Sequence, residues 1–166
     1  MSPSNIQDPK PNPDPNPDPN PNTVAPVDLA AVTAILDEEN LEYRLEEEFI
    51  RTGFANAAIV IALDSDALVF EAIWRGDFPL NMASQLLFAC NEHNQTHFAP
   101  TLRFFEKGTQ HLAVSAIRSV DVSHGASFNQ LGAFVVSSIE ATLQAFDYLA
   151  VTFPTLVTWE EPHNEH

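Results

Sequence analysis

The chain has 166 residues, 45% of them hydrophobic, which suits one domain with a packed core and is short for two. Its 7 Lys and Arg against 23 Asp and Glu give a formal net charge of -16, which argues against nucleic acid and anionic membrane surfaces as partners, because both attract basic proteins. Cys90 is the single cysteine, so an intramolecular disulfide and a cysteine-based metal cluster are excluded.

Two further features bear on where the protein is found. The N-terminus lacks the basic and then apolar layout of a signal peptide. No apolar run approaches the roughly 20 residues that a membrane-crossing helix needs. We therefore expect a cytoplasmic protein that does not enter a membrane.

The first 26 residues are rich in Pro, Asn and Asp. Proline alternates with Asn or Asp from Pro11 to Asn22, and nothing in this stretch can be buried in a core. Such a segment favours an extended polyproline II conformation of about 3.1 Å per residue. We expect residues 1–26 to be a disordered tail, which is either inert or serves as a tether or as a ligand for a proline-binding module.

The folded part is predicted to begin with a helix over residues 28–39. Apolar residues recur at helical spacing from Leu29 to Leu36, and Asp28 is a suitable N-cap. Asn40 suits the left-handed position that follows a helix, with Leu41 as the usual apolar contact.

Three strands are expected next. Tyr43 and Leu45 alternate with polar residues, and residues 57–63 form a short apolar run typical of a buried strand. Residues 67–74 alternate as well, with Phe70 and Trp74 on one face and Ile73 on the other. The tight connection over residues 64–66 predicts an antiparallel hairpin.

A second helix is predicted after Asp77-Phe78-Pro79 and ends at residues 91–94, with Cys90 on its apolar side. A second hairpin follows, made of residues 101–106 and 111–122. A third helix begins with a capping box formed by Ser127 and Gln130 and ends near Phe153-Pro154.

The predicted order is therefore α-β-β-β-α-β-β-α. Hairpins rather than long crossovers indicate an α+β domain, in which helices pack on a twisted antiparallel sheet. We place this domain at residues 27–156, between the tail of residues 1–26 and a polar C-terminal tail of residues 157–166.

The pattern resembles the YbjN-domain family, whose members are described as bacterial sensory transduction regulators. The resemblance covers residues 27–156, and its carriers are residues 29–41 with Tyr43, Ala72-Ile73-Trp74, Cys90-Asn91-Glu92-His93-Asn94, residues 127–131 and Phe153-Pro154. It implies a fold similar to type III secretion chaperones, commonly as a homodimer, and no catalytic residues. The Pro/Asn/Asp tail and Glu46-Glu47-Glu48 depart from the pattern, which puts the identity of the partner in doubt.

Two groups of side chains could carry chemistry at the end of the second helix. His93 and His97 have the i, i+4 spacing of zinc ligands, with Glu92 or His111 as a third ligand, although two exposed loop histidines fit the sequence better. Asn91 and Asn94 are interpreted as a structural helix-end motif, in which Asn94 takes the left-handed conformation and Asn91 bonds the last carbonyls or a neighbouring strand.

The aromatic residues indicate a binding surface. Phe104 and Phe105 are adjacent in a strand, so their rings lie on opposite faces of the sheet and one meets solvent unless both faces are covered. Trp74 lies near a strand end. Exposed apolar groups of this kind mark protein interfaces, and we treat Trp74, Phe104 and Phe105 as the candidate interface.

These features favour a non-enzymatic regulatory or chaperone-like module that binds a protein partner, forms a homodimer and needs no cofactor or metal. The alternative is a metal-binding sensor or metal-dependent enzyme that uses His93 and His97.

Overall fold

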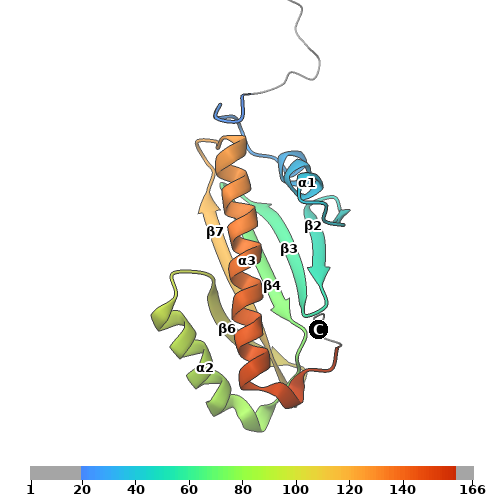
Figure 1. Cartoon of the computed structure of the whole chain (residues 1–166), viewed down its shortest axis with the longest axis vertical. Coiled ribbons are helices and arrows are strands. Elements are labelled where there is room, and N and C mark those ends of the chain that lie inside the picture. Colours follow the sequence, from blue (N-terminus) through green and yellow to red (C-terminus); the bar gives the residue numbers. More distant parts are fainter. Residues whose placement is uncertain (1–19, 160–166) are drawn as a thin grey trace, which may run out of the picture.

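Residues 20–159, the part of the chain that the computed structural model describes, form an antiparallel sheet with three helices on one of its faces (Figure 1). The elements in chain order are α1 (Leu29–Glu38), β1 (Arg44–Leu45), β2 (Phe49–Phe54), β3 (Ala57–Asp64), β4 (Ala67–Trp74), β5 (Phe78–Pro79), η1 (Leu80–Met82), α2 (Ala83–Thr96), β6 (Thr101–Lys107), β7 (His111–Asp121), α3 (Phe128–Thr152) and η2 (Pro154–Leu156). The α+β class and the antiparallel sheet expected from the sequence are confirmed.

The strands lie in the order β1-β2-β3-β4-β7, and β5 and β6 both pair with β7. Ser115 of β7 lies opposite Ile73 of β4 and also opposite Arg103 of β6, so β4 and β6 occupy opposite sides of β7. Within residues 20–159, β6 is therefore an edge strand of the sheet. Both predicted hairpins are present, as β3 with β4 and β6 with β7.

The predicted helix ends of α1 are confirmed. The side chain of Asp28 accepts a hydrogen bond from the amide of Ala31 at 2.9 Å. Asn40 has a φ of 59°, and the amide of Leu41 donates to the carbonyl of Leu36 at 3.0 Å. This geometry is a Schellman motif, which satisfies carbonyls that the end of the helix leaves unpaired.

The capping box of α3 is also confirmed. The amide of Gln130 donates to Oγ of Ser127 at 3.0 Å, and the side chain of Gln130 accepts from the amide of Ser127 at 2.8 Å. By length and composition alone, α3 could cross a membrane. Its packing on the sheet accounts for its apolar face, because the buried residues of the core lie along it.

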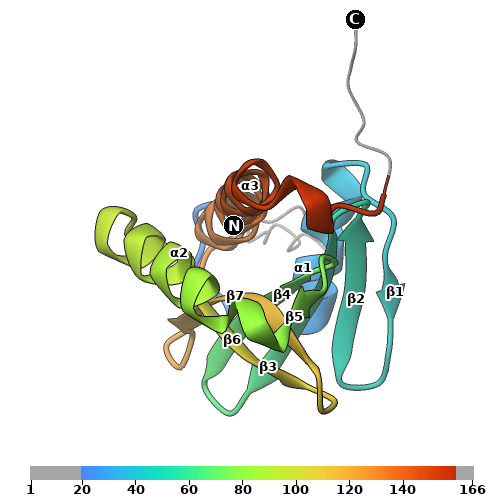
Figure 2. The same ribbon diagram turned by 90° about the horizontal axis from the view of Figure 1, so that it is seen from below.

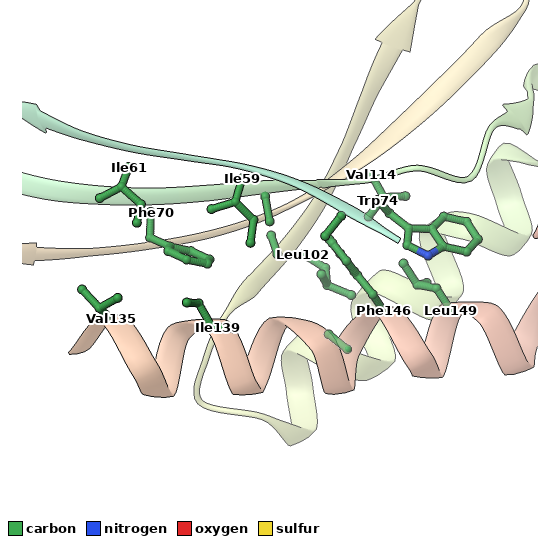
Figure 3. Packing of buried hydrophobic residues seen from close by; sticks show 14 of the residues in the cluster. Ile59, Ile61, Phe70, Trp74, Leu102, Val114, Val135, Ile139, Phe146 and Leu149 are labelled. Carbon is green, nitrogen blue, oxygen red and sulfur yellow. The ribbon is translucent and has the colours of Figure 1, made fainter. Parts of the chain in front are cut away.

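The core fills the space between the sheet and the helices α1 and α3 (Figure 3). Side chains of the two layers meet there, from the strands Ile59, Ile61, Phe70 and Val114, and from α3 Val135, Ile139, Phe146 and Leu149. Burial of this apolar surface is the main source of stability of such a layer structure.

Three elements differ from the prediction. Phe78 and Pro79 form the short strand β5, which pairs with β7, instead of opening the second helix. Residues 49–54 form the strand β2, which was not predicted, because Arg51 and Gly53 interrupt its apolar pattern. The helix α2 begins at Ala83 after a short 3₁₀ turn and continues to Thr96, beyond the predicted end at Asn94.

The segment before α1 is tied to the start of α3. Ala25 and Ala126 exchange backbone hydrogen bonds of 3.1 and 3.0 Å, and the side chain of Asn129 donates to the side chain of Asn22 at 2.9 Å. Gly125 has a φ of 83°, and a Cβ there would lie 2.7 Å from the carbonyl oxygen of Ala25. Residues 20–26 therefore belong to the folded part, which corrects the predicted tail of residues 1–26; residues 1–19 lie outside the described residues.

The packed chain also extends past the predicted C-terminal boundary at residue 156. The ring of Trp159 lies edge-on to Trp74, with 5.6 Å between the ring centres. Val157 packs against the core as well. The predicted polar tail is therefore wrong for residues 157–159, and its remainder, residues 160–166, lies outside the described residues.

Candidate functional site

One face of the sheet is not covered by a helix within residues 20–159, and we call it the open face. Figure 2 shows α1, α2 and α3 on the other side of the sheet. Four apolar residues lie near the centre of the open face, half-buried Val60, Val69 and Ile117 and the 37% exposed Ile73, and they surround Glu71. The strand ladders place these residues side by side on β3, β4 and β7, because alternate residues of neighbouring strands share a face.

The open face carries charges of both signs. By register, Glu71 lies between Val60 and Ile117, and Asp64 and Asp121 lie at one end of the face. Residues 20–159 contain six Lys and Arg. By register and alternation, four of them lie on the open face, Arg44 and Arg51 at its β1–β2 side and Arg103 and Lys107 at its β6 side. The helices α1, α2 and α3 contain no Lys or Arg.

These cations are exposed and only partly neutralised. Three form surface ion pairs, which are Arg44 with Glu46 at 3.7 Å, Arg103 with Glu71 at 3.8 Å and Lys107 with Asp77 at 3.9 Å. The guanidinium of Arg51 lies 5.0 Å from the centre of the Phe49 ring, a cation–π distance. Exposed ion pairs of this length exchange partners at little cost, about 0–1 kcal/mol each.

A hollow of about 570 Å³ adjoins the β6 side of the open face. Its walls include Arg103 and Ile117 of the open face and Phe98, which follows α2. Phe98 is 96% exposed, and nothing in its local sequence distinguished it as a surface residue. Its walls also include Arg118 and Phe134 of the helical side, so the hollow lies between the two faces and is lined by polar as well as apolar side chains.

The three predicted interface residues have different positions. Phe105 lies on the open face and is 41% exposed, whereas Phe104 points to the helical side and is half-buried. Trp74 is 1% exposed and packs against Phe78 and Trp159, so its assignment to an interface is corrected and it is a core residue. The sequence already indicated this position, because Trp74 and Phe70 are four residues apart in β4 and therefore lie on the same, buried face.

The two histidines lie together at the end of α2. The rings of His93 and His97 are stacked, with 4.3 Å between their centres and 7° between their planes. Nε2 of His93 is 3.1 Å from the carbonyl oxygen of Pro100, and since a carbonyl can only accept, this nitrogen carries the hydrogen. His93 is buried on α2, which corrects its interpretation as an exposed loop residue, whereas His97 is exposed directly after the helix, as predicted.

The environment of His93 disfavours its charged form. Burial lowers its pKa most, the hydrogen bond to Pro100 opposes this, and His97 lowers it further. As the pH falls, the unfolded chain therefore takes up a proton at this position before the folded chain does. The contribution of neutral His93 to the free energy of unfolding is therefore complete above the ordinary pKa of 6.5. It declines as the pH falls below that value.

The histidine pair does not assemble a metal site. Glu92 lines the same cavity of about 210 Å³ as the two rings, yet no group of three or more His, Cys, Asp or Glu side chains within residues 20–159 could hold a metal ion. The other predicted ligand, His111, pairs instead with Asp77 at 3.1 Å. The alternative of a metal site on His93 and His97 is therefore not supported by the geometry.

Asn94 has a different structural role from the one predicted. Its side chain donates to the carbonyl of Leu102 at 2.7 Å and accepts from the amide of Leu102 at 2.8 Å. The amide thus occupies the outer edge of β6 as a neighbouring strand would, and Asn94 does not adopt the predicted left-handed conformation. Asn91 is exposed on α2.

Cys90 is buried on the inner side of α2, as predicted. Burial raises the pKa of its thiol to about 11. A thiol with such a pKa is almost fully protonated at neutral pH, and the thiol is a poor nucleophile compared with the thiolate.

The fold is that of an α+β domain in which helices cover one face of an antiparallel sheet and leave the other face open. Among solved structures, YbjN from E. coli, described as "a putative transcription regulator", matches 75% of this chain and 92% of its own at 14% identity and a TM-score of 0.65. An uncharacterized protein from Methanothermobacter thermautotrophicus matches 75% of this chain and 97% of its own at 13% identity and a TM-score of 0.47. The chain therefore has a YbjN-like fold, as the resemblance predicted.

Comparison of sequences adds no relative. No family model matches the sequence, and no curated protein matches it either.

Proposed function

We propose that this chain is a non-enzymatic regulatory module that binds a protein partner through the open face of its sheet. The observation that carries the proposal is the group of apolar side chains on that face, Val60, Val69, Ile73 and Ile117, which surround Glu71 and which no helix covers within residues 20–159. Exposed apolar surface of this kind marks interaction sites. The likeness of fold to YbjN supports a regulatory rather than a catalytic role.

Site-specific photocrosslinking tests where the partner lies. A photoreactive phenylalanine analogue replaces Phe105 on the open face, Ile73 two strands away on the same face, or Phe88, which is 68% exposed on α2. We expect protein adducts from positions 105 and 73 in the cells that make the protein, and loss of these adducts when Val60 is replaced by Asp. Adducts from position 88 alone would refute the proposal.

A homodimer is part of the proposal, because the resemblance implies one. Light scattering coupled to gel filtration should give twice the mass of the chain at high micromolar concentration. A monomeric mass under these conditions would remove the dimer from the proposal without affecting the open face as a partner site.

A further inference from the structure

We infer that the outer edge of β7, beyond the start of β6, binds the C-terminal segment of a partner protein as an added strand that ends in a free carboxylate. This site lies at the edge of the sheet and not on the open face, so the inference goes beyond the proposed function. It follows from an unpaired stretch of β7, from the direction of a strand added there, and from the arginine beside it.

The strand β7 is longer than the part of it that β6 covers. β6 begins at Thr101, which lies opposite Ile117 of β7. Residues 118–121 of β7 pair with β4 on one side, and within residues 20–159 no strand pairs with them on the other side (Figure 1). An edge of this kind offers its outward N–H and C=O groups to an added strand.

The start of β6 determines which end of a partner segment fits. A strand that is added antiparallel to β7 runs in the same direction as β6, so its last residue lies opposite Arg118. Beyond this point the place beside β7 is taken by Thr101. The added strand therefore has to end there, after four residues or about 13 Å, and a chain end of this direction is a carboxylate.

Arg118 is positioned to bind this carboxylate. Its Nη1 donates to the hydroxyls of Ser137 and Ser138 on α3 at 2.7 and 3.2 Å, and its guanidinium lies 5.0 Å from the centre of the Phe134 ring. Within residues 20–159 no carboxylate forms an ion pair with it, and its Nε and Nη2 have no hydrogen-bond partner. These two nitrogens suit the bidentate pair that arginine forms with a carboxylate.

The hollow of about 570 Å³ lies beside this edge. Arg118 and Arg103 line it together with apolar side chains, among them the 96% exposed Phe98 and the 36% exposed Val120. No Asp or Glu is among the described residues that line it. An apolar segment with one terminal negative charge is therefore complementary to the hollow.

The acidic groups near the site do not take the place of this carboxylate. Glu71 pairs with Arg103, so the unpaired positive charge of the hollow is that of Arg118. Glu140 is exposed on α3 and does not line the hollow. Asp121 lies on the opposite face of β7 from Arg118, at the end where the added strand would enter. A basic residue fourth from the end of the partner would lie opposite Asp121, which is a favourable cross-strand pair.

A second copy of this chain is less suited to the same edge. Two β7 strands that pair antiparallel in one continuous sheet place residues of the same face opposite each other. The residues of the copy that share the face of Arg118 are Val120 and Val122, whereas Asp121 lies on the other face. Arg118 would therefore gain no carboxylate from β7 of a copy.

A peptide titration of the isotope-labelled full chain, followed by NMR, tests the inference. The probe is a short synthetic peptide that ends in Lys-Val-Ser-Val with a free carboxylate. The controls are the same peptide as a C-terminal amide and the peptide extended by Gly-Ser-Gly beyond its last valine. We expect saturable shifts of the backbone amides of residues 118–121 and of the guanidinium of Arg118, and at least tenfold weaker binding of the amide and of the extended peptide.

Variants then locate the binding. Arg118→Gln keeps a donor for Ser137 and should bind the acid peptide as weakly as the parent chain binds the amide. The matched variant Arg44→Gln removes an exposed cation from β1, at the other side of the sheet, and should keep the affinity of the parent. If Arg118→Gln lowers the urea midpoint, Phe98→Ser replaces it, because a 96% exposed ring can be removed without loss of the core, and the acid peptide should then bind at least threefold more weakly.

The outcomes separate this inference from the proposed function. Equal affinity for the acid and the amide, or no saturable shift at residues 118–121, would overturn the edge site. Shifts there that depend on the concentration of the chain alone would assign the edge to a second copy and overturn it as well. If crosslinks form at positions 73 and 105 while the peptide fails, only the edge site is wrong. If the peptide binds as expected and crosslinks form at position 88 alone, only the proposed function is wrong.

Discussion

The side chain of Asn94 should be a measurable source of stability, because it joins α2 to the edge of β6. In Asn94→Ala, two hydrogen bonds to the backbone of Leu102, of 2.7 and 2.8 Å, are lost. Each bond of this kind contributes about 0.5–1.5 kcal/mol, so the free energy of unfolding should fall by about 1–3 kcal/mol. Urea unfolding measures the loss, as a lower midpoint with an unchanged m-value.

Two further variants show whether the reasoning is correct. Asn91→Ala removes an exposed amide from the same helix and should change the free energy of unfolding by less than about 0.5 kcal/mol. Asn94→Asp keeps an acceptor for the amide of Leu102 but turns a second oxygen toward its carbonyl, so it should be no more stable than Asn94→Ala. A cost below about 0.5 kcal/mol for Asn94→Ala, or equal costs at positions 91 and 94, would refute the role of this side chain.

Three other predictions follow from the buried groups. His93→Gln keeps a donor for Pro100 and cannot be protonated, so between pH 7.5 and 5.5 its urea midpoint should fall less than that of the parent chain. The thiol of Cys90, whose pKa is about 11, should react with a thiol reagent at pH 8 only in urea, and rapid reaction of the native chain would contradict its burial. Trp159→Ala removes the ring against Trp74 and should lower the free energy of unfolding by about 1–2 kcal/mol, measured by urea with far-ultraviolet circular dichroism.

The features that local sequence determines were predicted best. The N-caps Asp28 and Ser127 and the left-handed Asn40 each depend on hydrogen bonds between residues at most five apart, so their signal lies in a short stretch of sequence. The alternation of β4 was also predicted, and it already contained the position of Trp74, on the same face as Phe70. The interface assignment of Trp74 was wrong, because a residue near a strand end is still buried when it lies on the buried face of that strand.

The open face depends on pairing between distant segments and could not be predicted in the same way. Arg51 and Arg103 have no local relation, and only the ladder through β3, β4 and β7 places them on one surface. The strand β2 that carries Arg51 was itself missed, because Arg51 and Gly53 interrupt its apolar pattern. Asn94 shows the same limit, since its partner Leu102 lies eight residues away across a turn.

The bonds between residues 20–26 and the start of α3 have a mechanical consequence. Ala25 pairs with Ala126, and the amide of Asn129 donates to the carbonyl of Pro21 at 3.0 Å. A pulling force applied to the chain ahead of Asn20 would therefore load the first turn of α3 before it reaches the apolar layer beneath. These few bonds would rupture first, and the helix would be the next element to carry the tension.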